Sequence, residues 1–268
     1  MTNNTEPGSG RLGCDEGVDR DALVAYLDHL LDASTGADWC PNGLQVEGRA
    51  RIQRLITGVS ACQALFDQAH EARADAVLVH HGLFWNGAPV ALIGVLGRRV
   101  RTLINAEINL FAYHLPLDRH RIYGNNAVAA RAFGLIDIEP FAEAKGLPVG
   151  VCGRLEDPIP SAELVARSER IYAQRPLHFP GGPEQVRTIG IVSGAGADAV
   201  YPALEAGLDA LVTGEPREWL MSLAREAGIH VLAAGHHATE RLGARALGEH
   251  LGEAFGLEVR FIDIPNPA

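Results

Sequence analysis

The sequence predicts an α/β protein with internal duplication. Three observations carry this prediction: strand-like and helix-like segments alternate, the chain can form a large core, and one strand–helix–strand pattern occurs twice. Of the 268 residues, 47 % are hydrophobic, which is ample for one large domain or two smaller ones.

The first expected helix follows a polar amino-terminal segment. Residues 1–18 are rich in Gly, Asn and acidic side chains and contain no apolar core of a secretion signal, so we expect a disordered tail. The helix is expected to begin at Asp19 or Asp21, because either side chain can cap it. Its apolar face consists of Leu23, Tyr26, Leu27, Leu30 and Leu31. A turn-rich loop at residues 38–46 follows it.

Short runs of apolar and β-branched residues predict the strands. They lie near residues 53–59, 75–80, 108–113, 148–153, 187–193, 208–213, 229–234 and 257–263. Helical patterns fill most of the gaps, and Pro158, Pro160 and the segment 180–183 predict loops.

We divide the chain at the change in pattern near its middle. The first α/β half is expected at residues 19–135 and the second at residues 136–268, with residues 229–268 packing across onto the first half. This boundary falls in the stretch 125–150, and the proline- and glycine-rich segment 180–186 is the alternative.

A weak internal repeat relates these two halves. Residues 56–60 (ITGVS) and a helix lead to residues 75–81, just as residues 189–193 (IGIVS) and a helix lead to residues 209–215. Generic similarity between α/β units is the alternative to duplication. Duplicated halves that face one another would bring their strand ends together, and open α/β sheets bind ligands at those ends.

The repeat continues to a second pair of strand ends. In the first half, His114 is followed four residues later by Asp118, and in the second half His236 is followed four residues later by Glu240. If a helix begins at His236, it and Glu240 share one face and can hold the same ion. The alternatives are a buried structural role for His114 and a turn or cap role for Asp118.

Two adjacent histidines end another predicted strand. His80 and His81 follow residues 75–79 (DAVLV), which are apolar after Asp75, and precede Gly82. Successive strand residues point to opposite faces, so these two imidazoles can serve two metal ions, or one ion and a substrate. An apolar core has no use for two such polar rings unless each has a partner. The pair therefore favours metal binding.

The candidate site thus combines side chains from three strand ends. Imidazole nitrogen and carboxylate oxygen are ligands of zinc, manganese and iron. The members are His80, His81, His114, Asp118, His236, His237 and Glu240. The remaining histidines are interpreted as structural, because none lies at a strand end with a suitably spaced carboxylate: His29, His70, His120, His178, His230 and His250.

Composition argues against several other classes of protein. The formal net charge of −10 disfavours a nucleic-acid-binding surface. No apolar stretch approaches the roughly 20 residues that a membrane span requires. The cysteines lie far apart without a CxxC pair, which excludes a thiolate zinc site and a disulfide framework: Cys14, Cys40, Cys62 and Cys152. We expect a soluble, cytoplasmic protein.

One rival motif points to a dinucleotide. Residues 194–199 read G-x-G-x-x-A after a strand, and Glu215 lies near the position of a ribose-binding acid. The repeat explains both differently, because residues 194–199 align with the turn after Ser60 and Glu215 aligns with the end of the strand carrying His80 and His81. We interpret Gly194 and its neighbours as a tight turn that approaches the substrate.

Two further signals are weak. Arg98, Arg99 and Arg101 form a basic run, which is interpreted as a solvated helix face, with a phosphate contact as the alternative. Ser60 and Ser193 stand at strand-to-helix turns, but the chain contains neither a GxSxG nucleophile elbow nor a GxxxxGK[ST] phosphate loop.

Taken together, the motifs resemble the NIF-three-like dinuclear metal-centre proteins, whose bacterial members are often labelled GTP cyclohydrolase 1 type 2 homologues. The segments that carry the resemblance occur in order along the chain: Asp38 with residues 42–46, His80-His81-Gly82, residues 114–118 with 124–126, and residues 235–240. The resemblance implies two intertwined α/β halves with mixed sheets and a toroidal homohexamer. It also implies the compact form, without an inserted central domain.

The resemblance further implies roles for the candidate residues. The ligands of two divalent metal ions (zinc, manganese or iron) would be His80, His81, Asp118, His236 and Glu240. His114 and His237 would lie beside the ions as proton shuttles or substrate contacts. The implied function is a metal-dependent, cyclohydrolase-like hydrolase acting on a nucleotide or related phosphorylated small molecule. The alternative is a non-enzymatic hexameric metal-binding scaffold or metallochaperone that interacts with other proteins.

Overall fold

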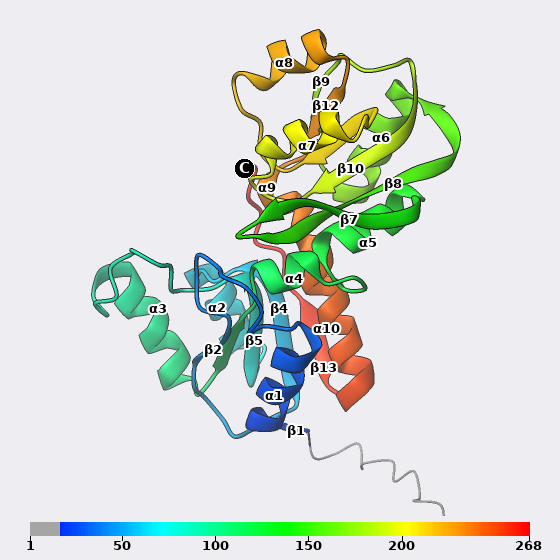
Figure 1. The fold of residues 1–268 in the computed structure, drawn as a ribbon. Helices are drawn as coiled ribbons and strands as arrows, with labels where there is room; N and C mark the ends of the chain where they lie inside the picture. The colour runs from blue at the N-terminus through cyan, green and yellow to red at the C-terminus, as the bar shows by residue number, and fades with distance from the viewer. Residues whose placement is uncertain (1–16) are drawn as a thin grey trace, which may run out of the picture.

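The computed structural model describes residues 17–268 and shows a mixed α/β fold with two mixed sheets (Figure 1). This confirms the predicted α/β class and the mixed sheets. Residues 1–16, most of the expected tail, lie outside the described residues. Val18, also assigned to that tail, instead begins the short strand β1 (Val18–Asp19), which pairs with β3 (Arg51–Ile52).

A five-stranded sheet forms the lobe at the bottom of Figure 1. Its strands, in spatial order, are β13 (Glu258–Phe261), β4 (Arg54–Ser60), β5 (Ala76–His81), β6 (Asn109–Ala112) and β2 (Gly43–Val46). The first four are parallel and confirm predicted strands, whereas β2 is antiparallel and was not predicted. Because β13 pairs with β4, the end of the chain completes the sheet of the first half.

Helices cover both faces of this sheet. The helices are α1 (Arg20–Leu30), α2 (Gln63–Glu71), α3 (Gly94–Asn105) and α10 (Arg241–Phe255). Asp19 caps α1 as expected, since its carboxylate accepts hydrogen bonds from the backbone N–H groups of Asp21 and Ala22. Leu27 of α1 and Leu251 of α10 belong to one buried cluster, and Phe66 of α2 belongs to the cluster on the opposite face.

A six-stranded sheet forms the other lobe. Its spatial order is β7 (Ile136–Ala144), β8 (Leu147–Pro160), β10 (Gln185–Val192), β11 (Ala210–Thr213), β12 (His230–Ala233) and β9 (Leu177–Phe179). Strands β10, β11 and β12 are parallel, and the other three run antiparallel to their neighbours. The predicted strand at 148–153 is thus one part of a longer hairpin of β7 and β8.

The loop predicted at Pro158 and Pro160 was wrong, because β8 continues through both prolines. Pro160 pairs with Gln185 of β10, and Pro158 lies in the part of β8 where the register with β10 shifts. Strand β7 accompanies β8 only as far as Arg154, so the prolines lie where β8 has a single neighbour. Bulges and edge positions tolerate proline because no ladder hydrogen bond depends on its missing N–H.

Helices also cover both faces of the second sheet. They are α5 (Asn125–Phe133), α6 (Ser161–Tyr172), the short helices η1 (Ala197–Ala199) and α7 (Val200–Glu205), and α8 (Leu220–Ala227). Phe133 and Leu164 belong to the buried cluster on one face, and Ala203 and Leu220 to the cluster on the other. Among residues 17–268, no helix is long and apolar enough to cross a membrane.

The two lobes meet around α4 (Leu115–Arg119), which lies between the sheets in Figure 1, and the start of α10, which runs from there along the lower lobe. Helix α4 follows β6 directly, whereas α10 follows β12 through the four-residue helix α9 (His236–Thr239). Helix α10 also packs against α5 of the upper lobe and β4 of the lower one. The carboxyl ends of strands from both sheets therefore open onto the same junction.

Candidate metal centre

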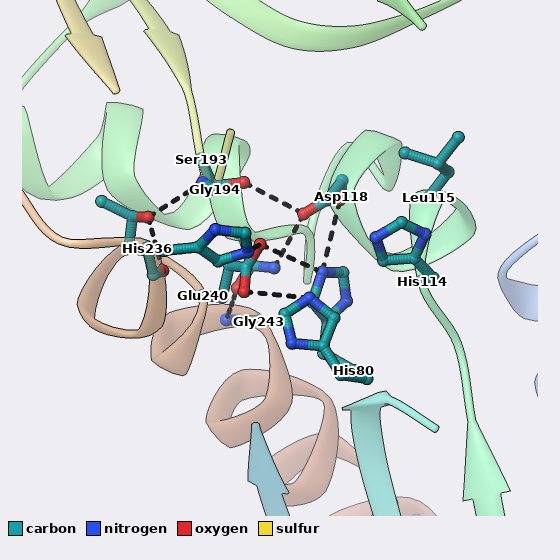
Figure 2. A network of polar contacts seen from close by, with 12 residues as sticks. His80, His114, Leu115, Asp118, Ser193, Gly194, His236, Glu240 and Gly243 are labelled. Carbon is teal, nitrogen blue, oxygen red and sulfur yellow. Dashed lines mark hydrogen bonds and ion pairs between the residues drawn. The ribbon is translucent and has the colours of Figure 1, made fainter. Parts of the chain in front are cut away.

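Five of the predicted site residues converge at this junction (Figure 2). His80 and His81 are the last two residues of β5, and Asp118 lies in α4. His236 begins α9, and Glu240 links α9 to α10. The two histidines of the first sheet thus face a histidine and a glutamate that follow the last parallel strand of the second sheet.

Glu240 lies at the centre of the cluster and is only 3 % exposed. Its Oε1 lies 3.1 Å from Nε2 of His236 and 3.5 Å from Nε2 of His80, and its Oε2 lies 3.2 Å from Nε2 of His81. Nε2 of His80 is also 3.5 Å from Oδ2 of Asp118. All three imidazoles therefore turn the same ring nitrogen toward carboxylate oxygens.

These separations fit atoms that share a cation. Two ligands that each lie about 2.0–2.2 Å from one ion are separated by roughly 3.0–3.5 Å. Within residues 17–268, Nε2 of His80 and Oε2 of Glu240 are buried and lack a hydrogen-bond partner, which is costly unless a ligand satisfies them. Ligand atoms of His81, His236 and Glu240 lie within 4.8 Å of one another. The arrangement can hold a metal ion.

Outer hydrogen bonds orient the imidazole rings. Nδ1 of His80 lies 3.0 Å from the backbone carbonyl of Tyr113, and Nδ1 of His236 lies 2.6 Å from Oε1 of Glu215. Because a carbonyl or a carboxylate only accepts, Nδ1–H donates in both cases, and in the neutral form of each ring Nε2 carries the lone pair that can bind a metal. Nδ1 of His81 lies 3.1 Å from the hydroxyl of Ser60. Such partners are typical of histidines that bind metals through Nε2.

Asp118 is oriented in a similar way. Its Oδ1 accepts hydrogen bonds from the Asn125 amide at 2.8 Å and the Ser193 hydroxyl at 3.0 Å, which leaves Oδ2 facing His80. The carbonyl oxygen of the Asn125 side chain accepts from the backbone N–H of Gly243 at 2.7 Å. Asn125 therefore connects Asp118 to the helix that follows Glu240.

Sequence reasoning assigned no role to these supporting residues. Ser60 and Ser193 were considered only as nucleophiles, and Glu215 only as a ribose-binding acid. The repeat contained a usable signal, because it aligned Ser60 with Ser193 and Glu215 with the end of β5. Nothing in the spacing of Asn125 predicted its contact with Asp118.

Charge and burial give the cluster its electrostatic character. Burial opposes protonation of His80, but the Asp118 and Glu240 carboxylates outweigh it and raise the pKa of His80 to about 9. Burial lowers the pKa of His81 to about 3, against the opposing effect of Glu240. Burial would raise the pKa of Glu240, yet the surrounding histidines hold it well below its usual value. The carboxylates thus favour positive charge at this point.

The two histidines predicted to lie beside the ions are placed differently. His114 lies beside the cluster, with its ring centroid 4.9 Å from that of His80, and its Nδ1 is 2.7 Å from Oδ1 of Asp38. His237 is bound elsewhere: its Nε2 lies 2.7 Å from Oδ1 of Asp263, and it is not part of the cavity lining. The structure therefore brings His114, but not His237, to the cavity.

Gly194 of the rival motif is part of the same centre. Its φ is +62°, and an added Cβ would lie 2.4 Å from Oε1 of Glu240 and 3.1 Å from Nε2 of His236. The helix after the motif is six residues long, and Glu215 contacts His236. The glycine is thus explained by the close approach of the backbone to Glu240, without a dinucleotide.

A cavity of about 1000 Å³ opens over the cluster. Its lining includes His81, His114, Asp118, His236 and Glu240 from the candidate site. The walls add aromatic and cationic side chains, namely Trp39, Trp85, Arg99 and Lys145. The cluster is therefore accessible to a small molecule.

Comparison with known proteins identifies the relatives of this chain. The model of the family Duf34/NIF3 (NGG1p interacting factor 3) matches residues 18–267. A protein of Vibrio cholerae named GTP cyclohydrolase 1 type 2 homolog is 45 % identical over 249 residues, which cover 91 % of this chain and 98 % of the relative. A protein of the same name from Pseudomonas aeruginosa is 45 % identical over 92 % of this chain and 97 % of its own length.

Solved structures show the same fold. The structural-genomics protein ybgI, of unknown function, matches with a TM-score of 0.88 and 42 % identity over 94 % of this chain and all of its own. The protein TTHA1606 from Thermus thermophilus matches with a TM-score of 0.82 and 37 % identity, again over 94 % of this chain and all of its own. Reduced HcgD from Methanocaldococcus jannaschii has a TM-score of 0.81 at 19 % identity, covering 92 % of this chain and 98 % of its own; it supports the fold alone.

Proposed function

The chain belongs to the Duf34/NIF3 family, and we propose that it is a metal-dependent hydrolase with a dinuclear centre, acting on a nucleotide or related phosphorylated small molecule. The observation that carries the proposal is the convergence of three Nε2 atoms on Glu240 beneath an accessible cavity. The name of its bacterial relatives, GTP cyclohydrolase 1 type 2 homolog, agrees with this class of substrate.

The contacts suggest how the residues divide between two ions. His80 and Asp118 would hold one ion, and His81 and His236 the other, with Glu240 between the two pairs. Glu240 would serve both pairs, because its carboxylate lies within 3.5 Å of Nε2 of all three histidines. Five protein ligands leave coordination positions for water and substrate. Zinc, manganese and iron all accept these donors.

The chain's own residues would prepare this centre for hydrolysis. When bound, the ions would supply a water molecule of lowered pKa and polarise the bond to be broken. Glu215, Ser60 and the carbonyl of Tyr113 hold the imidazoles in one orientation, so little reorganisation is needed on binding. His114 is anchored on Asp38 through Nδ1, which leaves Nε2 to hold or move a proton.

We propose that the protein forms a homohexamer, as the resemblance implies. Support comes from an exposed apolar surface around the start of α3, because large exposed patches mark interaction sites. The residues are Val90, Leu92, Ile93 and Val95. We also propose that the two halves arose by duplication, since β4-β5-β6 and β10-β11-β12 follow the same parallel order.

The proposal is tested by measuring bound metal and turnover on the same preparations. Wild type is compared with Glu240→Gln and His81→Ala, and nucleotides, phosphoesters and cyclic amides serve as substrates. Glu240→Gln should lose both metal and turnover, because it removes the bridging carboxylate. Matched controls are Glu249→Gln in α10 and His70→Ala in α2, which lie outside the cluster.

The outcomes separate the enzyme from its alternative. A wild type that binds no metal after reconstitution would contradict the site itself. Full metal occupancy without turnover on any substrate class would contradict the hydrolase and favour a metal-binding scaffold or metallochaperone. Turnover that depends on Glu240 but not on Glu249 supports the proposal.

A further inference from the structure

One arginine of the basic run in α3 faces the metal cavity. Arg99 lines the cavity, whereas Arg98 and Arg101 line a separate, smaller hollow beside Gln63 and Thr102. The sequence left two interpretations of this run open, a solvated face and a phosphate contact. In the structure, only Arg99 is placed where it could contact a phosphate in the metal cavity, whereas Arg98 and Arg101 lie outside that cavity.

Arg99 has no anionic partner among residues 17–268. Its Nε is buried without a hydrogen-bond partner, and none of its nitrogens lies within ion-pair distance of a described carboxylate. By contrast, Arg49 and Arg154 each pair with an aspartate. Acidic side chains do line the cavity, at Glu143 and Asp198, but neither contacts Arg99. Its guanidinium is therefore available to a ligand.

Two indole rings line the same cavity and lie next to histidines of the candidate site. The Trp85 ring centroid lies 5.7 Å from that of His81 and 5.2 Å from that of His114. Trp39 lies 5.9 Å from His114 and is 44 % exposed, with the ammonium of Lys145 4.7 Å from its ring centroid. Exposed indole faces are favourable contacts for a planar ring.

We propose that Arg99, Trp39 and Trp85 form the substrate-recognition subsite of this cavity, where Arg99 binds a phosphate group and the indoles contact a planar ring. A guanidinium forms paired, charge-assisted hydrogen bonds with phosphate, and no other arginine lines the cavity within residues 17–268. The ligand class is therefore a nucleotide. This inference rests on the proposed function only in using the same cavity, whose volume of about 1000 Å³ accommodates a ligand of that size.

Equilibrium binding of GMP, guanosine and inorganic phosphate to the metal-loaded protein tests the subsite. Tryptophan fluorescence is a suitable signal, because Trp39 and Trp85 line the cavity and the third tryptophan, Trp219, stacks on Tyr201 outside it. Wild type should bind GMP about tenfold or more tightly than guanosine, as expected for a charge-assisted contact. Inorganic phosphate should compete with GMP.

Variants assign this preference to individual side chains. Arg99→Leu should lower GMP affinity to that of guanosine, while Arg101→Leu, on the same helix but outside the cavity, should keep the difference. Trp39→Ala should weaken GMP and guanosine by the same factor, because it removes only the ring contact. An unchanged GMP-to-guanosine ratio in Arg99→Leu would overturn the inference, as would a wild type that binds both equally.

Failure of the subsite and failure of the hydrolase give different results. Binding that depends on Arg99 in a protein without turnover would support the subsite and overturn the hydrolase. Turnover of a substrate without phosphate, together with equal binding of GMP and guanosine, would overturn the subsite and leave a metal-dependent hydrolase. Bound metal measured in Arg99→Leu shows whether the centre itself is intact.

Discussion

The two halves of the molecule are alike where their second parallel strands begin. Asp75, just before β5, accepts hydrogen bonds at 2.9 Å from the backbone N–H groups of Gln53 and Arg54. Asp209, just before β11, accepts them at 2.8 and 2.9 Å from Arg187 and Thr188. Each carboxylate thus connects the start of its own strand by hydrogen bonds to the backbone of the neighbouring strand.

The same strands differ at their carboxyl ends. Strand β5 ends in His80 and His81, whereas the corresponding positions after β11 are Gly214 and Glu215. A Cβ on Gly214 would lie 2.5 Å from the carbonyl oxygen of Gly194 and 2.8 Å from Cα of His236, so no histidine fits there. Glu215 instead supports His236, which follows the next strand.

This difference shows that structure and function occupy opposite ends of the repeated unit. The aspartates at the beginnings satisfy backbone donors, a requirement shared by both sheets. The carboxyl ends differ, because the two sheets together form one cluster and contribute different side chains to it. The first half contributes adjacent imidazoles, and the second contributes Glu240 together with the close backbone at Gly194 that leaves room for it.

The largest effect on the centre, apart from loss of a ligand, is expected for Gly194→Ala. The added methyl would occupy the space next to Glu240 Oε1, so metal affinity should fall by at least about a hundredfold, as for disrupted metal sites. Gly207→Ala is the matched control, because Gly207 also has positive φ (+66°) but has no atom within 4 Å of the added Cβ. Calorimetric metal titration measures both.

The Gly207→Ala control separates the effect of backbone strain at positive φ from the effect of a methyl group that obstructs the metal centre. Gly207→Ala should cost only about 1–2 kcal/mol of stability from its left-handed backbone, with metal affinity unchanged. Equal metal affinity in the two variants would show that Gly194 does not shape the centre.

The next effect concerns the strand beginnings, where the halves are alike. Asp75→Ala should lower the free energy of unfolding by about 2–4 kcal/mol, because two backbone donors lose their acceptor. Asp209→Ala should cost less, about 1–3 kcal/mol, since Asp209 is only half-buried and lacks a counterpart of the Arg49 contact at Asp75. Urea unfolding measures both values.

Metal affinity serves as the control for this pair. Both variants should bind metal as wild type does once folded, because neither aspartate contacts the cluster. A loss of metal binding in folded Asp209→Ala would contradict the separation of roles between the two ends of the strands.

The same division explains what the sequence could predict. The parallel strands were found because buried strands are continuous apolar runs, as in residues 76–79 and 210–212. Strand β7 was missed because most of its side chains are exposed and it contains a proline. The full length of β8 was missed because prolines, which it tolerates at an edge, were interpreted as loop residues. Residues that point to metal chemistry by type, such as His80 and Glu240, were found by their strand-end spacing.

The supporting residues could not be found in that way. Glu215 and His236 are 21 positions apart, as are Ser60 and His81, and such pairs meet only through the packing of neighbouring strands. A glutamate or serine has many uses, so its type alone indicates none. The resemblance placed His237 beside the ions, whereas in the structure its Nε2 lies 2.7 Å from Oδ1 of Asp263.

A smaller effect is expected at Glu215, the position where the second half differs from His81. Glu215→Gln keeps an acceptor for the Nδ1–H of His236 but removes its negative charge. Metal affinity should fall by about 10–100-fold, the usual range for loss of an outer partner of a ligating histidine. Glu218→Gln, three residues further along, is a control with no contact to the cluster. A decrease as large as that of Glu240→Gln would show that Glu215 is itself a ligand.

The smallest effect is expected for two serines that occupy matching positions in the two halves, at the ends of β4 and β10. Ser60 is the last residue of β4 and Ser193 follows β10, and their hydroxyls contact His81 at 3.1 Å and Asp118 at 3.0 Å. Neutral hydrogen bonds contribute less than charged ones, so Ser60→Ala should reduce metal affinity by no more than about tenfold. Ser193→Ala should have a larger effect within that range, because its acceptor is a carboxylate. A larger effect of Ser60→Ala would contradict this expectation. It would show that the orientation of His81 depends on Ser60 more strongly than the orientation of Asp118 depends on Ser193, so that the two halves differ here as well.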